Sequence, residues 1–153
     1  MKNLAILSLL SILLLPILVA ACGGKESTNV TTTTTSQYDQ TINITLDEFS
    51  SHLHVIKFIQ MAPSDTLEIR LGTNPSTGYE WADAVFDPPG VVRQVSRNYE
   101  EPTTTGMVGA PGTDVWVFEV TTKGLTVLTI GYFRPFETGQ EPLYSISINF
   151  EIK

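Results

Sequence analysis

The amino-acid sequence predicts an all-β fold, an antiparallel β-sandwich of about seven to eight strands, over residues 38–153. From Tyr38 onward, apolar and polar residues alternate with a period of two, the spacing of a half-buried strand. No stretch keeps an apolar stripe of helical period for three turns, and clusters of glycine and proline separate the alternating runs. These features are typical of a sandwich or barrel built from short strands.

The alternation is most regular at the end of the chain, over residues 143–152. Tyr144, Ile146 and Ile148 share one face there, while serine and asparagine occupy the other. The same alternation, or a weaker form of it, predicts seven further strands, in chain order 40–46, 52–60, 66–71, 79–86, 91–99, 113–121 and 125–133.

The order of these strands places three connections at one end of the sandwich. Successive antiparallel strands have their connections alternately at the two ends, so the third, fifth and seventh share an end. These connections span residues 72–78, 100–112 and 134–142, and they are the longest or the most unusual in composition. Immunoglobulin-like sandwiches use one end of loops for recognition in this way, so we expect an immunoglobulin-like sandwich that binds through this end.

Composition limits the functions that the chain can have. Its 153 residues carry a net charge of −7, which disfavours nucleic acid and anionic membrane surfaces as partners. A single cysteine, Cys22, allows no intrachain disulfide and no cysteine-based metal cluster. Two histidines, His52 and His54, leave little material for a metal site or for acid–base catalysis, so no metal or cofactor is expected.

The first 21 residues are predicted to be an export signal and not part of the fold. Lys2 gives a short positive start, and the segment from Leu4 to Ala21 is uncharged and mostly apolar. The signal ends in the sequence VAACG (residues 19–23), which resembles the lipobox of prokaryotic lipoproteins, where the cysteine is lipidated. This predicts an exported protein, lipid-anchored through Cys22 to a prokaryotic cell membrane or envelope. The alternative is an uncleaved anchor with an incidental cysteine.

Residues 22–37 are predicted to form a flexible tether. The segment is glycine, serine, threonine and charge, including an unbroken run from Thr31 to Thr35. Such a composition cannot bury enough apolar surface to order itself, so it would hold the domain of residues 38–153 away from a membrane.

The three connections at the predicted binding end each contain a short motif with a plain structural interpretation. Residues 74–79 read NPSTGY and could be an ordinary turn, because Pro75 fixes one backbone angle and Gly78 permits a positive φ. Residues 109–112 read GAPG and could be a flexible connection, although the preceding Met107 and Val108 are unusually apolar. In the third motif, RPF, the arginine could pair with Glu137 or stack on a ring.

Taken together and in this order, the three motifs resemble those of the chagasin family, inhibitors of papain-like cysteine peptidases. That family carries NPTTGY-like, GxxG and RPW-like segments on three adjacent loops, and the resemblance here covers roughly residues 51–153. A second GxxG frame at 106–109 also fits, but a strand is predicted to start directly after Gly112. The resemblance implies the following peptidase-binding residues: Asn74, Pro75, Ser76, Thr77, Gly78, Tyr79, Gly109, Ala110, Pro111, Gly112, Arg134, Pro135 and Phe136.

The same resemblance implies a mechanism. The chain would be a reversible, competitive inhibitor with no catalytic residues of its own, and a monomer. Its first motif would enter the peptidase cleft with Thr77 nearest the catalytic cysteine and histidine, and the other two motifs would cover the flanks. Phe136 departs from the family pattern, because its ring is smaller than the usual tryptophan and lacks the indole N–H donor. Ser76 and Pro111 are milder departures.

Two other functions fit parts of the sequence. A surface adhesion or carbohydrate-binding module would use the same leader, tether and sandwich, but would not require the three motifs. A secreted hydrolase would need a catalytic constellation, and no serine lies in a G-x-S-x-G context. His52 and His54 are expected on one face of a strand without an obvious third metal ligand. Trp81 and Trp116 are expected in the core.

Overall fold

The computed structural model describes residues 38–102 and 109–153. Within them the chain forms two short helical elements, α1 (Leu46–Ser51) and the 3-10 turn η1 (Pro75–Thr77). The strands are β1 (Gln40–Ile44), β2 (His54–Met61), β3 (Thr66–Thr73), β4 (Glu80–Trp81), β5 (Val85–Asp87), β6 (Val92–Glu100), β7 (Gly112–Val120), β8 (Gly124–Phe133) and β9 (Tyr144–Ile152). The predicted signal segment, Cys22 and the tether lie outside the described residues, as do Met107 and Val108.

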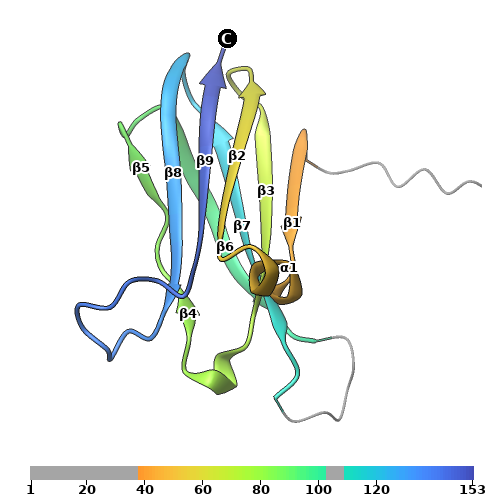
Figure 1. The fold of residues 1–153 in the computed structure, drawn as a ribbon. Helices are drawn as coiled ribbons and strands as arrows, with labels where there is room; N and C mark the ends of the chain where they lie inside the picture. The colour runs from red at the N-terminus through yellow and green to blue at the C-terminus, as the bar shows by residue number, and fades with distance from the viewer. Residues whose placement is uncertain (1–37, 103–108) are drawn as a thin grey trace, which may run out of the picture. The chain divides into compact units, whose positions relative to one another are not determined.

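The strands form two sheets that pack face to face (Figure 1). One sheet has the order β1-β3-β7-β6, and the other has the order β2-β9-β8-β4, with β5 also paired to β8. The predicted all-β sandwich is therefore confirmed, and most pairs are antiparallel as expected. The pairs β1–β3 and β2–β9 are parallel. The consecutive strands β1 and β2 belong to different sheets, and α1 connects them.

Two predicted details of the elements are wrong. The strand expected over 79–86 is two strands, β4 and β5, because residues 82–84 leave the ladder. Asp83 lies there with a side chain 98% exposed, bonded to Arg97 at 3.3 Å, and aspartate is a poor strand former. In addition, His52 is not on a strand with His54 but ends α1 as its C-cap.

The helix α1 is set by local capping that a search for long apolar stripes does not detect. Thr45 accepts a hydrogen bond from the Glu48 backbone N–H at 3.3 Å, and the Glu48 carboxylate accepts one from the Thr45 N–H at 2.8 Å. This reciprocal capping box satisfies two backbone donors at the start of the helix. Phe49 then points into the core and is fully buried.

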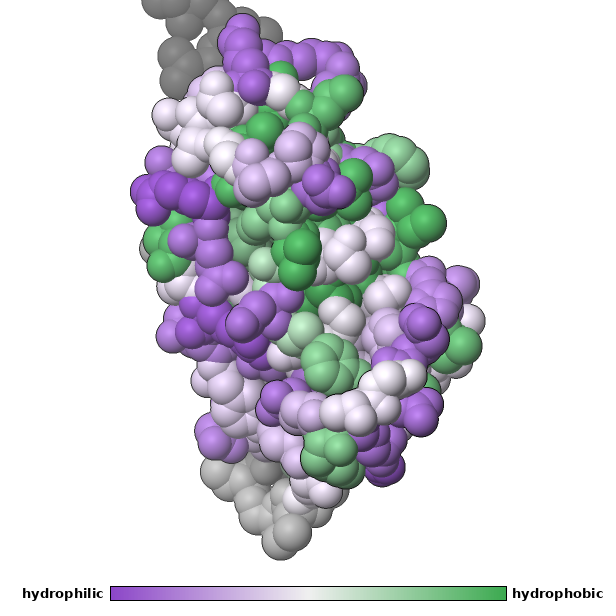
Figure 2. Space-filling model, turned by 90° about the vertical axis from the view of Figure 1, so that its left-hand side faces the viewer, coloured by the Kyte–Doolittle hydropathy of each residue, from purple (hydrophilic) through white to green (hydrophobic). Residues whose placement is uncertain are grey.

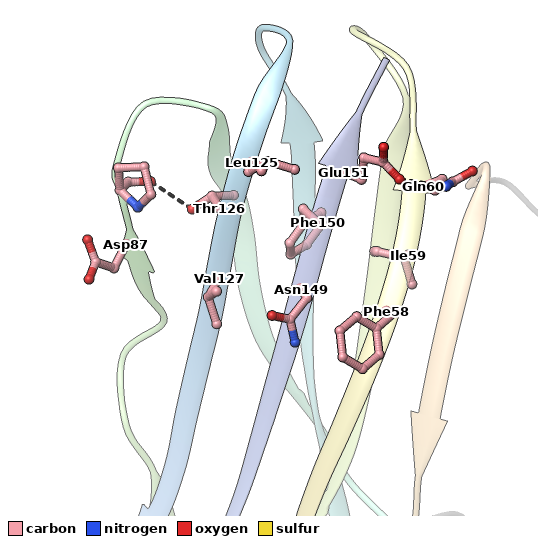
Figure 3. Close-up of a pocket in the computed structure, with 11 residues that line it drawn as sticks. Phe58, Ile59, Gln60, Asp87, Leu125, Thr126, Val127, Asn149, Phe150 and Glu151 are labelled. Carbon is pink, nitrogen blue, oxygen red and sulfur yellow. Dashed lines mark hydrogen bonds between the residues drawn. The ribbon is translucent and has the colours of Figure 1, made fainter.

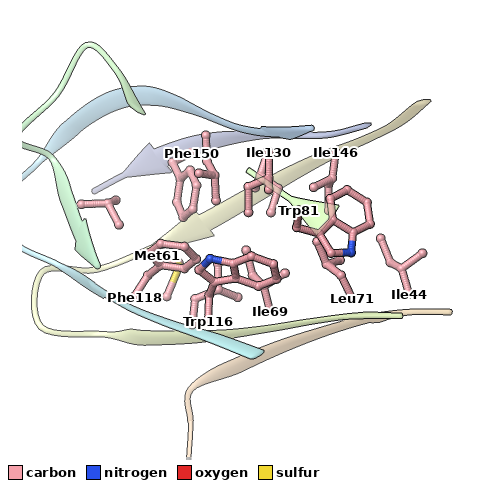
Figure 4. Packing of buried hydrophobic residues seen from close by; sticks show 14 of the residues in the cluster. Ile44, Met61, Ile69, Leu71, Trp81, Trp116, Phe118, Ile130, Ile146 and Phe150 are labelled. Atoms are coloured by element: carbon pink, nitrogen blue, oxygen red, sulfur yellow. The ribbon is translucent and has the colours of Figure 1, made fainter. Parts of the chain in front are cut away.

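The core lies between the two sheets (Figure 4). The inward positions of the alternating runs fill it, so that Ile69 of β3 and Ile148 of β9 are both fully buried. Trp81 and Trp116 are also buried, which confirms the prediction that both belong to the core. Burial of this apolar surface, at about 25 cal/mol per Å², is the main force that holds the two layers together.

The connections predicted to share one end do so (Figure 1). The β3–β4 and β8–β9 connections lie at the lower end in that view, as do the described ends of the β6–β7 connection, whereas β9 finishes at the opposite end. Across residues 38–102 and 109–153, no helix has the length and apolar character needed to cross a membrane.

Candidate functional site

Three predicted loops meet at this end of the sandwich, and together we call them the three-loop edge. They are Asn74–Tyr79 between β3 and β4, Gly109–Gly112 leading into β7, and Arg134–Phe136 after β8. Contacts between loops, described below, join the first loop to each of the other two. Segments about 30 and 60 residues apart in sequence thereby form one surface.

The first loop folds into the 3-10 turn η1 because its sequence caps both ends. Asn74 precedes the turn, and its side-chain oxygen accepts a hydrogen bond from the Ser76 N–H at 3.2 Å. Pro75 occupies the first position, where a backbone donor would have no partner in the turn. Gly78 ends the turn with φ 76°, in the left-handed region that glycine adopts without strain.

Thr77 lies in the exposed part of this loop and helps to close it. Its hydroxyl donates to the Asn74 carbonyl oxygen at 2.7 Å, and its backbone N–H donates to the same oxygen at 3.1 Å. The Gly78 N–H donates to the Pro75 carbonyl at 3.1 Å. The free protein therefore holds the exposed residues 75–78 in one compact turn before any partner binds.

The second loop is fixed to the first by a hydrogen bond. The side-chain amide of Asn74 donates to the Gly109 carbonyl oxygen at 3.1 Å. Gly109 has φ 80°, a conformation that few other residues adopt. Gly109 and Pro111 are exposed, but Gly112 is buried. A Cβ at Gly112 would overlap the Tyr99 hydroxyl. Gly112 is thus required for packing of β6 against β7 and lies beneath the exposed surface.

The third loop contacts the first through both of its larger side chains. The Arg134 guanidinium lies 4.5 Å from the ring centroid of Tyr79 and donates to the Glu137 carboxylate at 3.0 Å. Both structural roles considered for this arginine, pairing and stacking, are therefore present. The bond to Glu137 raises the pKa of Arg134 further, so the guanidinium remains charged. Phe136 is 70% exposed, and the edge of its ring lies against Gly78.

Beneath the three-loop edge lies a group of aromatic side chains that the motif search did not identify as functional. Tyr79, assigned to binding from the sequence, is half-buried and stacks on Tyr132 with ring centroids 5.4 Å apart. Trp81 and Tyr144 pack on other sides of Tyr132, at 4.8 and 5.8 Å. The signal in the sequence was the placement of aromatic residues on strands directly flanking the first and third motifs.

The histidines do not form a second site. His54 Nδ1 lies 2.9 Å from the Ser145 hydroxyl across the β2–β9 pair. Among the described residues, no three His, Cys, Asp or Glu side chains are grouped so as to hold a metal ion.

A separate groove of about 610 Å³ crosses the outer face of the β2-β9-β8 sheet, away from the three-loop edge (Figure 3). Phe58, which is 80% exposed, and Leu125 lie at its sides. Two of its polar side chains bond to each other, since the Gln60 amide donates to the Glu151 carboxylate at 2.6 Å. Figure 2, which views the β5 and β8 side, shows apolar side chains interspersed with hydrophilic ones. The groove contains none of the predicted binding residues.

A preformed edge of three loops on a sandwich is the kind of surface expected of a protein that binds another macromolecule. Comparisons with known proteins define this class further. Residues 60–150, which contain all three motifs, match the family described as "Chagasin family peptidase inhibitor I42". The chain belongs to the chagasin family of peptidase inhibitors, which confirms the inhibitor function predicted from the motifs.

Two similar proteins from Entamoeba histolytica agree with this assignment, and a third, more distant structure is also similar. Amoebiasin-2 from Entamoeba histolytica is 36% identical over 92 residues, which cover 59% of this chain and 72% of that protein. The crystal structure of the cysteine protease inhibitor EhICP2 from Entamoeba histolytica has a TM-score of 0.56 at 31% identity, covering 75% of this chain and 98% of that one. PbICP-C, solved in complex with falcipain-2, has a TM-score of 0.48 at 16% identity, covering 65% and 89%.

Proposed function

We propose that this protein inhibits papain-like cysteine peptidases reversibly, by placing the three-loop edge across the active-site cleft. The observation that carries the proposal is the physical union of the three motifs. Asn74 joins the first loop to Gly109, and Tyr79 joins it to Arg134. Family membership supports a peptidase as the partner.

The shape of the first loop explains why such an inhibitor would not be cleaved. The segment from Pro75 to Gly78 is a closed turn, in which both the Thr77 and Gly78 N–H groups bond within the loop. A peptide bond held in this turn is not presented in attack geometry to a nucleophile in the cleft. Inhibition would follow from occupancy of the cleft, so it would be competitive with substrate.

The rigidity of the edge supports tight binding. Peptidase–inhibitor interfaces bury roughly 1,600 Å² in total, and their affinity depends on preorganisation more than on area. Pro75, Pro111 and Pro135 place one proline in each loop. The hydrogen bond from Asn74 to Gly109 and the stacking of Arg134 on Tyr79 restrict the loops further. Phe136 offers an exposed aromatic anchor at one flank, the kind of residue that dominates interface energies. One inhibitor chain would bind one peptidase.

The function is tested by titrating the full chain against papain with a fluorogenic substrate, with trypsin as a control peptidase of another class. We expect the apparent inhibition constant for papain to rise linearly with substrate concentration. Activity should return on dilution, and mass spectrometry should find the inhibitor uncleaved. Equal inhibition of trypsin, a substrate-independent inhibition constant, or cleavage between residues 74 and 79 would contradict the proposal.

We further propose that the chain is exported and anchored by lipid at Cys22. The proposal rests on the sole cysteine lying at the end of an uncharged apolar leader, after small residues. Replacing Cys22→Ser should leave an unprocessed precursor or release the domain from bacterial membranes, measured by fractionation and immunoblotting. Equal amounts of mature-sized protein in the membranes for both versions would contradict the anchor.

A further inference from the structure

Tyr132, on β8, lies directly under the three-loop edge. Its side chain is buried, with 3% of the residue exposed, and its hydroxyl accepts a hydrogen bond from the Asn74 backbone N–H at 3.0 Å. Its ring packs on Tyr79, the last residue of the first loop. Tyr132 thus contacts both the first and the last residue of that loop.

The two contacts continue into the other loops. Asn74, held through its backbone by Tyr132, uses its side chain to bind the Gly109 carbonyl. The Tyr79 ring, which stacks on Tyr132, also contacts the Arg134 guanidinium. Each of the other two loops is therefore linked to the Tyr132 side chain through a single intermediate residue, Asn74 for the second loop and Tyr79 for the third.

We propose that Tyr132 is a positioning residue that holds the three loops in the arrangement that binds the peptidase. The inference deepens the proposed function and rests on it, because it requires the three loops to act as one surface. Without the phenol oxygen, the part-buried Asn74 N–H loses its acceptor, and the start of η1 is no longer fixed. The loops then spend less time in the joined arrangement.

The kinetic consequence differs from that of losing a contact residue. If only a fraction of molecules has the joined arrangement, the apparent affinity falls by that fraction. The loss appears in the association rate constant, because fewer encounters meet a competent edge, while the complex once formed is unchanged. Loss of a side chain that touches the peptidase would instead appear mostly in the dissociation rate constant.

The chain offers a matched pair of variants. Tyr132→Phe removes only the hydroxyl and keeps the ring that packs on Tyr79 and Trp81. Tyr144→Phe removes a hydroxyl from the neighbouring strand, from a ring stacked 5.8 Å from Tyr132, and no hydrogen bond joins that hydroxyl to the described loop residues. Tyr132 is buried and Tyr144 is half-buried, and the rings share one aromatic group. An effect of removing any hydroxyl from this group would appear in both variants, whereas loss of the bond to Asn74 would appear in Tyr132→Phe alone.

The experiment measures association and dissociation rate constants for papain with the full chain and both variants, by stopped-flow inhibition and dilution. Tyr132→Phe should lower the association rate constant about five- to thirty-fold, as expected when a part-buried donor loses its acceptor, with the dissociation rate constant changed less than about two-fold. Tyr144→Phe should leave both within about two-fold. A normal association rate constant in Tyr132→Phe, or a loss confined to dissociation, would overturn the inference.

A second measurement needs no peptidase. Amide hydrogen exchange at Asn74 should be faster in Tyr132→Phe than in the parent, and unchanged in Tyr144→Phe. Unchanged exchange at Asn74 would overturn the positioning role even if inhibition is confirmed. Failure of the parent chain to inhibit papain would overturn the proposed function and, with it, this inference. Inhibition by the parent with equal behaviour of both variants would overturn this inference alone.

Discussion

Two regions of this sandwich expose a phenylalanine, and they support it in different ways. Phe136 at the three-loop edge is 70% exposed, and Phe58 on the outer face of β2 is 80% exposed. Phe136 lies against Gly78 of another loop, above stacked aromatic rings. Phe58 borders a groove on a regular sheet face (Figure 3). Exposure alone would rank Phe58 above Phe136, so it does not point to the predicted binding residues.

What separates the two regions is the structure beneath the exposed groups. At the three-loop edge, backbone that is neither strand nor long helix is held by bonds within the first loop and by one bond to the second, and binding would order it little further. On the groove face, the backbone is held by the sheet itself, and Gln60 bonds to Glu151. A preformed irregular surface is the better indicator of recognition, and substitutions in both regions test this directly.

The largest expected effect is at the centre of the edge. Thr77→Arg would place a long charged side chain in the exposed turn and would remove the hydroxyl that bonds the Asn74 carbonyl. We expect a loss of several kcal/mol in binding to papain, measured as the inhibition constant, because a steric conflict at the cleft centre cannot be relieved at the rim.

The matched control for this change is Thr77→Ser, which keeps the hydroxyl and should bind within about 1 kcal/mol of the parent. Circular dichroism should be the same for all three proteins. If Thr77→Arg inhibits papain as well as the parent, the central position of this loop is wrong and the adhesion alternative gains weight.

The second effect compares the two phenylalanines directly. Phe136→Ala should weaken papain inhibition by about 1–3 kcal/mol, as expected for an aromatic anchor at an interface flank. Phe58→Ala, a truncation of an even more exposed ring, should change the inhibition constant by less than about 0.5 kcal/mol. Equal losses for the two variants would show that the groove face also meets the peptidase.

A smaller change in the same place restores the residue that the family motif usually has. Phe136→Trp adds contact area and an indole N–H donor at an exposed position, so there is no core to overpack. We expect affinity for papain to be unchanged or improved by about 1 kcal/mol, measured with the same assay. A loss of affinity would mean that the cleft flank is shaped for the smaller ring.

Much of this architecture followed from the sequence, because a period of two is a direct consequence of strand geometry. The strands and the buried tryptophans needed only this period. The shared end of the three connections was predicted from a count of eight strands, and it holds although residues 79–86 form two strands, because β4 and β5 both run antiparallel to β8. The elements that were missed depend on other signals. The helix α1 is shorter than two turns, so only its capping residues Thr45 and Glu48 reveal it. The break at residues 82–84 contains Asp83, whose exposed side chain bonds to Arg97, a contact that the period of two does not reveal.

Within the site, the sequence identified which segments come together but not the structural role of each residue in them. The buried position of Gly112 depends on the register of β6 against β7, which brings Tyr99 over it. The contact of Tyr132 with Asn74 joins residues 58 apart, and it follows only from the arrangement of the two sheets. Motif matching therefore finds the exposed loops more readily than the residues that support them.

The smallest expected effect compares the two ends through acid sensitivity. At the loop end, the Glu48 carboxylate accepts from the Thr45 N–H at 2.8 Å, and at the far end Asp39 accepts from the Thr66 N–H at 2.7 Å. These backbone hydrogen bonds are the main cause of a lowered pKa in each carboxyl. When the pKa of a carboxyl is lower in the folded state than in the unfolded state, its ionised form stabilises the fold. This stabilisation is fully present above the unfolded-state pKa and is lost as the pH falls through the folded-state pKa.

We therefore expect Glu48→Gln and Asp39→Asn each to lower the melting temperature slightly at pH 6, because the neutral amide is a weaker acceptor. The difference from the parent should shrink as the pH is lowered from 6 through the ordinary carboxyl range and below it, as the parent carboxyls become protonated. Thermal unfolding followed by circular dichroism across this range measures it, and Asp47→Asn, an exposed acid on α1 whose side chain has no hydrogen bond in the described residues, is the control. Because the two sites lie at opposite ends, the double variant should show the sum of the two shifts. A parent-to-variant difference that stays constant with pH would show that these carboxylates do not cause the acid sensitivity at either end.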